Sequence, residues 1–172
     1  MPAPSTWVIP QIKKAIIVGV ADMVATNDPG AELVTYSLGS CLGVTVYDPI
    51  KKAGGLLHLM LPDSSINPQR AAAEPYMFVD TGVPLLFKAV YNLGGDRFRV
   101  VVKVAGGAQF FDPNRSFNIG ERNCGALHAL LARKGYSIHA EAVGGVCSRT
   151  LRLDLSNGNV TISSPGVNLC RL

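Results

Sequence analysis

Charged residues are scarce in this chain of 172 residues. Asp, Glu, Lys and Arg together make up 16% of the sequence, whereas hydrophobic residues make up 48%. This composition excludes a disordered chain, because so many apolar side chains can be buried in a core. The length fits a single domain, at about 100–200 residues per domain. A chain of this size buries roughly 70% of its unfolded surface and needs no disulfide or metal to fold.

Three kinds of segment are also missing. No apolar run approaches the roughly 20 residues of a membrane-spanning helix, so membrane insertion is not expected. The first residues, MPAPSTW, contain no basic stretch before an apolar core, so no signal peptide is visible and we expect a cytoplasmic protein. No run of Lys or Arg exceeds two residues, and no aromatic residues are interleaved with such runs, so a nucleic-acid partner is not expected.

Cysteine is present but not in pairs. Cys41, Cys124, Cys147 and Cys170 lie far apart, and no C-x-x-C motif occurs. This spacing excludes the usual zinc and haem motifs. In a reducing compartment we expect four free thiols.

Positive charge is concentrated in the second half of the chain. The formal net charge is +4, but residues 97–152 hold nine Lys and Arg against three Asp and Glu, whereas residues 1–96 hold six against eight. The basic part could attract an acidic partner. A mixed solvated surface without a binding role explains the same counts equally well.

The 18 glycines and 11 prolines predict many short elements rather than a long helical bundle. Apolar runs predict strands at residues 15–20, 32–38, 42–47, 55–61, 98–104, 137–143, 150–155 and 160–163. Helices are predicted from near residue 80 to residue 93 and from near residue 118 to residue 134, each ended by glycine. Residues 63–74 are predicted to be a polar loop. The expectation is one α/β domain of about seven or eight strands and two helices at residues 15–172, after a flexible leader at residues 1–14.

Cys41 is the cysteine best placed for chemistry. It follows Gly39 and Ser40 at a break between two predicted strands. Such a turn exposes a side chain and leaves backbone N–H groups free to bind an oxyanion. Cys124, by contrast, lies on the apolar side of a predicted helix. Because a lone cysteine is most often a small buried apolar residue, Cys41 by itself is only a candidate nucleophile.

His58 is the only polar residue in a strand that is apolar on both faces. A buried imidazole is costly unless it is hydrogen-bonded, so His58 either has a structural partner or belongs to a site. A hairpin between its strand and the preceding one would bring it near Cys41, as a Cys–His pair requires. Thr35 could join them only if the chain bends, because six residues of straight strand span roughly 20 Å. Its hydroxyl would then accept the imidazole N–H and fix the tautomer.

Several short motifs stand in order along the chain. They are TYSLGSCLGV at residues 35–44, YDP at 47–49, GGLLHLMLP at 54–62, KVAGGA at 103–108, IGERN at 119–123, and the glycines at 144–145 followed by Arg149. Together they resemble the signature of the CheD family, the chemoreceptor glutamine deamidases, over residues 15–163. The family's Thr, Cys and His match Thr35, Cys41 and His58 with the same spacings.

The resemblance implies a fold and a reaction. The implied fold is a three-layer α/β sandwich related to the catalytic domain of cytotoxic necrotizing factor toxins. The implied reaction is hydrolysis of glutamine side-chain amides to glutamate on methyl-accepting chemotaxis receptors, and in some members also hydrolysis of glutamyl methyl esters. The implied partners are the receptor cytoplasmic domain and a CheC-type phosphatase, and no metal or organic cofactor is implied.

The mechanism and the function each leave alternatives open. His58 either takes the Cys41 proton or holds a thiolate–imidazolium pair that lowers the cysteine pKa. A non-catalytic chemotaxis adaptor that binds receptor or phosphatase helices would have no chemical need for Thr35, Cys41 and His58 together. A thiol redox sensor would need a resolving cysteine, and none is close to Cys41 in sequence.

Overall fold

The computed structural model describes residues 13–109 and 118–172. Its strands are β1 (Lys14–Ile17), β2 (Asp22–Thr26), β3 (Ala31–Leu38), β4 (Leu42–Asp48), β5 (Ala53–Leu59), β6 (Val101–Gly106), β7 (Ile138–Val143), β8 (Arg149–Asp154), β9 (Val160–Ser164) and β10 (Val167–Arg171). Its helices are α1 (Pro68–Ala73), α2 (Val79–Asn92) and α3 (Ile119–Lys134), with short 3₁₀ turns η1 (Ser64–Ile66) and η2 (Pro75–Met77). None of these helices combines the length and the apolar character needed to cross a membrane.

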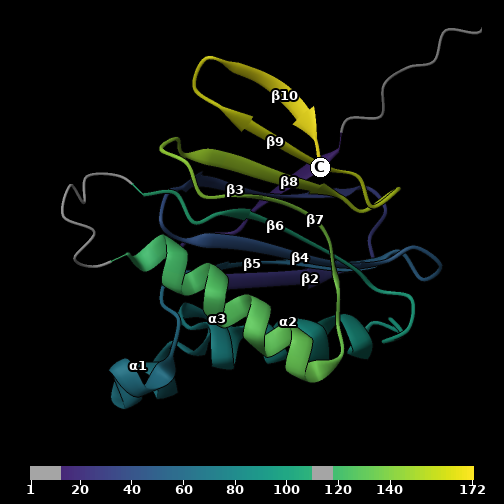
Figure 1. Ribbon diagram of the computed structural model, residues 1–172. Helices are drawn as coiled ribbons and strands as arrows, with labels where there is room; N and C mark the ends of the chain where they lie inside the picture. The colour runs from purple at the N-terminus through teal and green to yellow at the C-terminus, as the bar shows by residue number, and fades with distance from the viewer. Residues whose placement is uncertain (1–12, 110–117) are drawn as a thin grey trace, which may run out of the picture.

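The strands form two five-stranded sheets. The order in the outer sheet is β1-β3-β8-β9-β10, and in the inner sheet it is β2-β5-β4-β6-β7. The pairs β1–β3 and β6–β7 are parallel, and all other described pairs are antiparallel. Helices α2 and α3 lie along one side of the inner sheet, and the outer sheet lies on its other side (Figure 1). The predicted α/β class is confirmed.

Strands β4 and β5 form the buried centre of the molecule. Every residue of both strands is buried, because helices cover one face of the inner sheet and the outer sheet covers the other. Leu57 and Leu59 belong to the core shared with α2 and α3, whereas Leu56 belongs to the core between the sheets. Because side chains alternate along a strand, His58 points with Leu56 toward the outer sheet.

The register of the β4–β5 hairpin puts Gly43 directly opposite His58. A Cβ atom on Gly43 would lie 2.7 Å from the Leu151 side chain and 2.8 Å from the Leu38 side chain, and both belong to the outer sheet. Glycine here lets the outer sheet pack closely against β4, because any larger residue would push these two leucine side chains aside. His58 in turn faces the outer sheet across this close contact.

Asp48 anchors the other end of the same hairpin. Its buried carboxylate accepts hydrogen bonds from the backbone N–H groups of Ile50, Lys51 and Asp96, and from the Arg99 guanidinium at 2.7 Å. Burial alone would raise the pKa of Asp48, but the hydrogen bonds from Arg99 and the backbone outweigh burial and lower it to about 2. The ionised carboxylate fixes the turn, and with it the register that aligns Gly43 with His58.

The prediction of seven or eight strands and two helices was too low for the described part of the chain. Strands β2 and β10 and helix α1 were missed. Helix α1 lies within the predicted polar loop, where the Asn67 side chain caps it and Pro68 starts it, and only Ala71 is buried. So short and exposed a helix leaves no apolar periodicity in the sequence. The predicted leader lies outside the described residues except for Lys13 and Lys14, and Lys14 already begins β1.

Candidate active site

Thr35 and His58 are brought into direct contact from different sheets. The hydroxyl Oγ1 of Thr35 lies 2.8 Å from Nδ1 of His58 and 2.8 Å from the carbonyl oxygen of Val18. A carbonyl can only accept, so the single hydroxyl proton of Thr35 is donated to Val18. Oγ1 therefore accepts from Nδ1–H, which fixes the neutral imidazole with its proton on Nδ1 and its lone pair on Nε2.

The chain bends between Thr35 and Cys41, as the site requires. The pairing of β3 with β8 shifts register between Thr35 and Leu38, and Ser37 adopts a left-handed conformation with φ 57°. After Leu38 the chain leaves the outer sheet and enters the inner sheet at β4. The straight-strand separation of roughly 20 Å therefore does not apply, because Thr35 and Cys41 stand in facing layers.

Cys41 directly precedes β4 and is half-buried. It lies two residues before Gly43, so it is on the same face of the inner sheet as Gly43, and it packs against the core between the sheets. Diagonal neighbours on paired strands have Cα atoms about 7–8 Å apart, which long side chains bridge. With Gly43 opposite His58, Cys41 is the diagonal neighbour of the imidazole.

Burial controls the protonation of both groups. It raises the pKa of the Cys41 thiol, against a smaller lowering effect of the cysteine's own backbone N–H. It also lowers the pKa of His58, which is 2% exposed. Both shifts favour the neutral thiol with the neutral imidazole over a preformed ion pair. The buried Nε2 of His58 has no hydrogen-bond partner within residues 13–109 and 118–172, so its lone pair is available to take a proton.

The turn before Cys41 is held by its carbonyl groups. The carbonyl oxygens of residues 39, 40 and 41 accept hydrogen bonds from Ala108 N at 2.8 Å, Asn123 Nδ2 at 3.0 Å and Gly107 N at 2.8 Å, respectively. Gly106, with φ 116°, must be glycine, because a Cβ atom there would lie 2.2 Å from the Cys41 carbonyl oxygen. Sequence analysis gave Asn123 no role. Asn123 is the last residue of the motif IGERN, but its place in that motif carries no information about its hydrogen-bond partners.

The remaining cysteines and histidines lie elsewhere. Cys124 is half-buried against the core beneath α3, and Cys147 and Cys170 are exposed free thiols. His128 pairs with Glu141 at 2.8 Å, and Nδ1 of His139 accepts from the backbone N–H of residue 102. Among the described residues, no group of three or more His, Cys, Asp or Glu side chains is arranged to hold a metal ion.

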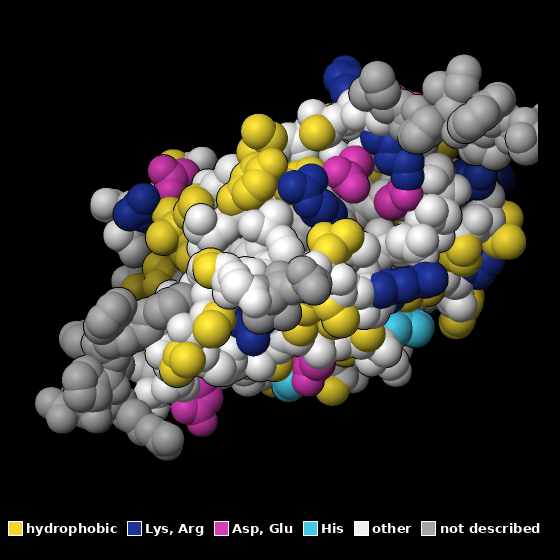
Figure 2. Space-filling view, turned by 90° about the horizontal axis from the view of Figure 1, so that it is seen from above, with side chains coloured by type: hydrophobic (Ala, Val, Ile, Leu, Met, Phe, Trp, Pro, Cys, Tyr) yellow, Lys and Arg dark blue, Asp and Glu magenta, His cyan; other side chains and the backbone are white. Residues whose placement is uncertain are grey.

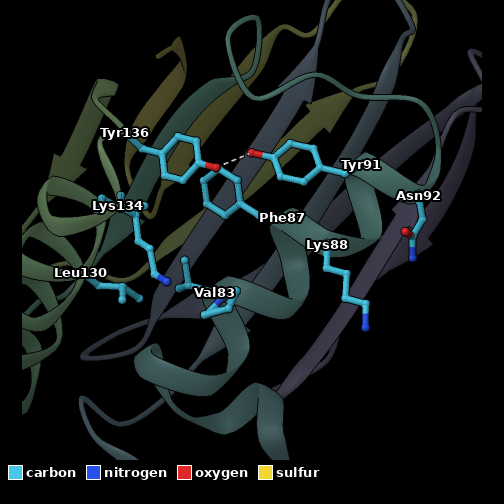
Figure 3. Close-up of a pocket in the computed structure, with 10 residues that line it drawn as sticks. Val83, Phe87, Lys88, Tyr91, Asn92, Leu130, Lys134 and Tyr136 are labelled. Atoms are coloured by element: carbon cyan, nitrogen blue, oxygen red, sulfur yellow. Dashed lines mark hydrogen bonds between the residues drawn. The ribbon is translucent and has the colours of Figure 1, made fainter.

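An apolar pocket of about 380 Å³ between α2 and α3 is separate from these residues (Figure 3). The Tyr91 and Tyr136 hydroxyls point toward each other and lie 2.6 Å apart, and Phe87 stacks on Tyr136 with a centroid distance of 4.4 Å. Its only charged lining residues are Lys88 and Lys134. The described lining of the pocket thus contains neither a thiol nor an imidazole, and so it lacks a Cys–His pair.

Within the described residues, part of the positive charge in the second half of the chain is paired with acidic side chains. Arg99 pairs with Asp48 and Asp96, and Arg152 pairs with Glu32. Figure 2 shows Lys and Arg side chains interspersed with Asp and Glu side chains on the face that it presents. These observations favour the mixed solvated surface over a dedicated site for an acidic partner.

Comparisons with known proteins agree with the motifs. The family described as "CheD chemotactic sensory transduction" matches residues 60–164. A protein of Syntrophus aciditrophicus named "Probable chemoreceptor glutamine deamidase CheD 1" is 46% identical over 151 residues, which is 88% of this chain and 94% of that protein. Similarly named proteins of Solibacter usitatus and Pyrococcus horikoshii are 47% and 43% identical, and cover 88% and 86% of this chain and 89% and 90% of their own lengths.

The two kinds of match cover different parts of the chain. The family match begins at Met60, after Thr35, Cys41 and His58, and includes Asn123. The matches to whole relatives extend over nearly nine-tenths of the chain at more than 40% identity. By both criteria, the chain belongs to the CheD family.

Proposed function

We propose that this chain is a protein-glutamine deamidase that converts specific glutamines of methyl-accepting chemotaxis receptors to glutamate. Cys41 is the nucleophile, His58 is the general base and acid, and Thr35 orients the imidazole. The observation that carries the proposal is the hydrogen-bonded chain from the Val18 carbonyl through Thr35 to His58 Nδ1, which leaves the Nε2 lone pair without a described partner on the face of the inner sheet where Cys41 also lies. The names of the relatives as chemoreceptor glutamine deamidases support the choice of substrate.

The reaction runs in two halves. His58 Nε2 takes the proton of the Cys41 thiol as sulfur attacks the carboxamide carbon, and the carbonyl oxygen becomes an oxyanion. The imidazolium then gives its proton to the leaving nitrogen, so that ammonia departs and a thioester remains. In the second half, Nε2 takes a proton from water and hydroxide attacks the thioester carbon. The C–S bond then breaks, the imidazolium returns its proton to the sulfur, and glutamate leaves. Backbone N–H groups around Cys41 stabilise the oxyanion in both halves.

Three finer points rest on the family resemblance. A glutamyl methyl ester presents the same carbonyl carbon with methanol as its leaving group, so we propose that receptor methyl esters are also substrates. We propose a CheC-type phosphatase as a protein partner and the cytoplasm as the site of action. We also propose that the helices, inner sheet and outer sheet form the three-layer α/β sandwich of the cytotoxic necrotizing factor catalytic domain.

Ammonia release tests the proposed function directly. The purified chain is incubated with a receptor cytoplasmic domain, and ammonia is measured over time. We expect release that requires both proteins and that stops when the accessible receptor glutamines are consumed. Release no faster than from the receptor alone would contradict the proposal.

The Thr35 hydroxyl should contribute through one neutral hydrogen bond to the imidazole. Such a bond is worth about 0.5–1.5 kcal/mol, so Thr35→Val should lower kcat/KM by about 2- to 13-fold. Loss of tautomer control adds to this effect, because the Nδ1 proton would lose its acceptor. Thr35→Ser keeps the hydroxyl and should retain more activity than either Thr35→Val or Thr35→Ala. If Thr35→Val matches the wild type, Thr35 only packs, and the site reduces to Cys41 and His58.

If the Cys41 thiol and the His58 imidazole are both neutral before substrate binds, then alkylation of Cys41 by iodoacetamide should depend on pH in a distinct way. Because burial raises the pKa of Cys41, its alkylation rate should rise with pH above the ordinary thiol value of about 8.5. Because burial lowers the pKa of His58, kcat/KM should fall with acid only below the ordinary histidine value of about 6.5. Residue-specific mass spectrometry separates Cys41 from the exposed Cys147 in the same sample. A reactive Cys41 thiolate that persists below neutral pH would instead indicate a thiolate–imidazolium pair.

A further inference from the structure

We infer that Asn123 is a positioning residue that holds the Ser40–Cys41 peptide so that the Cys41 N–H faces the oxyanion formed during deamidation. This inference rests on the proposed function and assigns a role to a residue of α3 that lies far from Cys41 in sequence. The inference depends on the hydrogen-bond partners of the buried Asn123 side-chain amide and on the planarity of the peptide bond.

The Asn123 side chain connects the two halves of the site. It is fully buried, and its Nδ2 donates to the Ser40 carbonyl oxygen at 3.0 Å and to the Met60 carbonyl oxygen at 2.9 Å. Ser40 directly precedes the nucleophile, and Met60 follows His58 by two residues. Both neighbours are carbonyl oxygens, so only the NH₂ end of the amide fits between them. One side chain therefore ties the turn that carries Cys41 to the end of the strand that carries His58.

The orientation of the Cys41 N–H follows from the Ser40 carbonyl. In a trans peptide the C=O and N–H groups are coplanar and point in opposite directions. With the Ser40 carbonyl held by Asn123, the Cys41 N–H points away from α3. This N–H acts on the cysteine's own sulfur, since it lowers the pKa of the thiol against the effect of burial. The same N–H is thus on the side where sulfur attacks the substrate and where the oxyanion forms.

The neighbouring peptides are held by the backbone, and only this one depends on a side chain. The Gly39 and Cys41 carbonyls accept from the backbone N–H groups of Ala108 and Gly107, whereas the Ser40 carbonyl accepts from Asn123. Without Asn123, the Ser40–Cys41 peptide loses its described carbonyl partner and is free to rotate. A rotated peptide would present its carbonyl oxygen to the oxyanion in place of its N–H, and would oppose the transition state.

Asn123 is not what anchors α3 to the inner sheet. The helix is held by its apolar residues, of which Leu127, Leu130 and Leu131 are buried in the core shared with α2 and β4. The described hydrogen bonds of the Asn123 side chain all go to the two carbonyls beside the site. Removing the amide should therefore leave α3 docked while the Ser40–Cys41 peptide becomes unconstrained.

The test compares Asn123→Ala and Asn123→Ser with Leu127→Val, a matched change one helical turn away in the same core. Loss of one oxyanion donor typically costs about 10²–10³ in kcat, and we expect a loss in this range for both Asn123 variants, with KM within about 3-fold. Alkylation of Cys41 by iodoacetamide is a direct displacement that forms no oxyanion, so its rate should stay within about 3-fold of wild type. Leu127→Val should lower Tm but keep kcat at a temperature at which it is folded.

Two results would overturn the inference. One is wild-type kcat in a folded Asn123 variant. The other is a parallel loss of kcat and of Cys41 alkylation, which would mean general disorder of the site rather than rotation of one peptide. If Asn123→Ala does not fold, Asn123→Ser, which keeps a small polar group in the space, provides the same comparison. Cys41→Ala in the same assay distinguishes a failure of the proposed function from a failure of this inference. If Cys41→Ala still converts glutamine, Cys41 is not the nucleophile, whatever the Asn123 variants show.

Discussion

Cys41→Ala is expected to abolish deamidation and to leave the fold intact. The thiol provides the sulfur that forms the thioester, and alanine cannot replace it. Loss of a covalent nucleophile lowers kcat by at least about 10⁴-fold, because the other members of the site do little without it. Cys41 is only half-buried and precedes β4, so removing its sulfur should change Tm little. Steady-state turnover on a receptor cytoplasmic domain and thermal unfolding of the same samples measure the two effects.

Cys147→Ala is the matched control for this experiment. Cys147 is an exposed thiol outside the Thr35–His58 site, and its removal should leave kcat within about 2-fold of wild type, as expected for a surface change. Turnover by Cys41→Ala well above the rate without enzyme would exclude Cys41 as the nucleophile. If the chain is instead a non-catalytic adaptor, the wild type shows no turnover, and Cys41→Ala binds the receptor as well as the wild type does.

His58→Ala should cost nearly as much activity as Cys41→Ala. The imidazole takes the thiol proton, protonates ammonia and then activates water, so every proton transfer of the reaction passes through Nε2. Members of such a site act as a unit, and we expect kcat to fall by at least about 10³-fold. Alkylation of Cys41 near neutral pH should also slow, because the nearby base that assists thiolate formation is gone. Turnover and the pH dependence of Cys41 alkylation measure these two consequences.

His128→Ala is the corresponding control. His128 lies on the outer side of α3 and pairs with Glu141 on the surface, with its side chain 48% exposed. Its removal should change neither kcat nor the alkylation of Cys41. If His58→Ala leaves the alkylation profile of Cys41 unchanged, then the two residues are not paired, and the general base must be sought elsewhere.

The sequence predicts those parts of the site that depend on local patterns. The apolar pattern of residues 42–47 and the apolar run around His58 predict the two central strands, and the helix predicted from near residue 118 to residue 134 matches α3 to within a residue at each end. A single polar residue in a strand that is apolar on both faces is also a local signal, and it marks His58 as a candidate without any knowledge of its partners.

What the sequence could not predict depends on contacts between layers. No local pattern states that residues 31–38 and 42–48 belong to different sheets, although that crossing brings Thr35 against His58. The acceptor of the Thr35 proton, the Val18 carbonyl, is a backbone atom and leaves no mark in the sequence. Asn123 likewise acts through two carbonyls at positions 40 and 60, and the residue types at those positions say nothing about such a bond.

The most direct test of the central claim is mass spectrometry of receptor peptides after reaction in water enriched in heavy oxygen. The account predicts that the wild-type chain converts particular receptor glutamines to glutamate, and that each new carboxylate contains one heavy oxygen atom, because water cleaves the thioester. It also predicts that a rapidly acid-quenched sample contains the receptor segment joined to the Cys41 peptide. Unchanged glutamines after prolonged incubation, or conversion with the covalent adduct on another residue, would contradict the account.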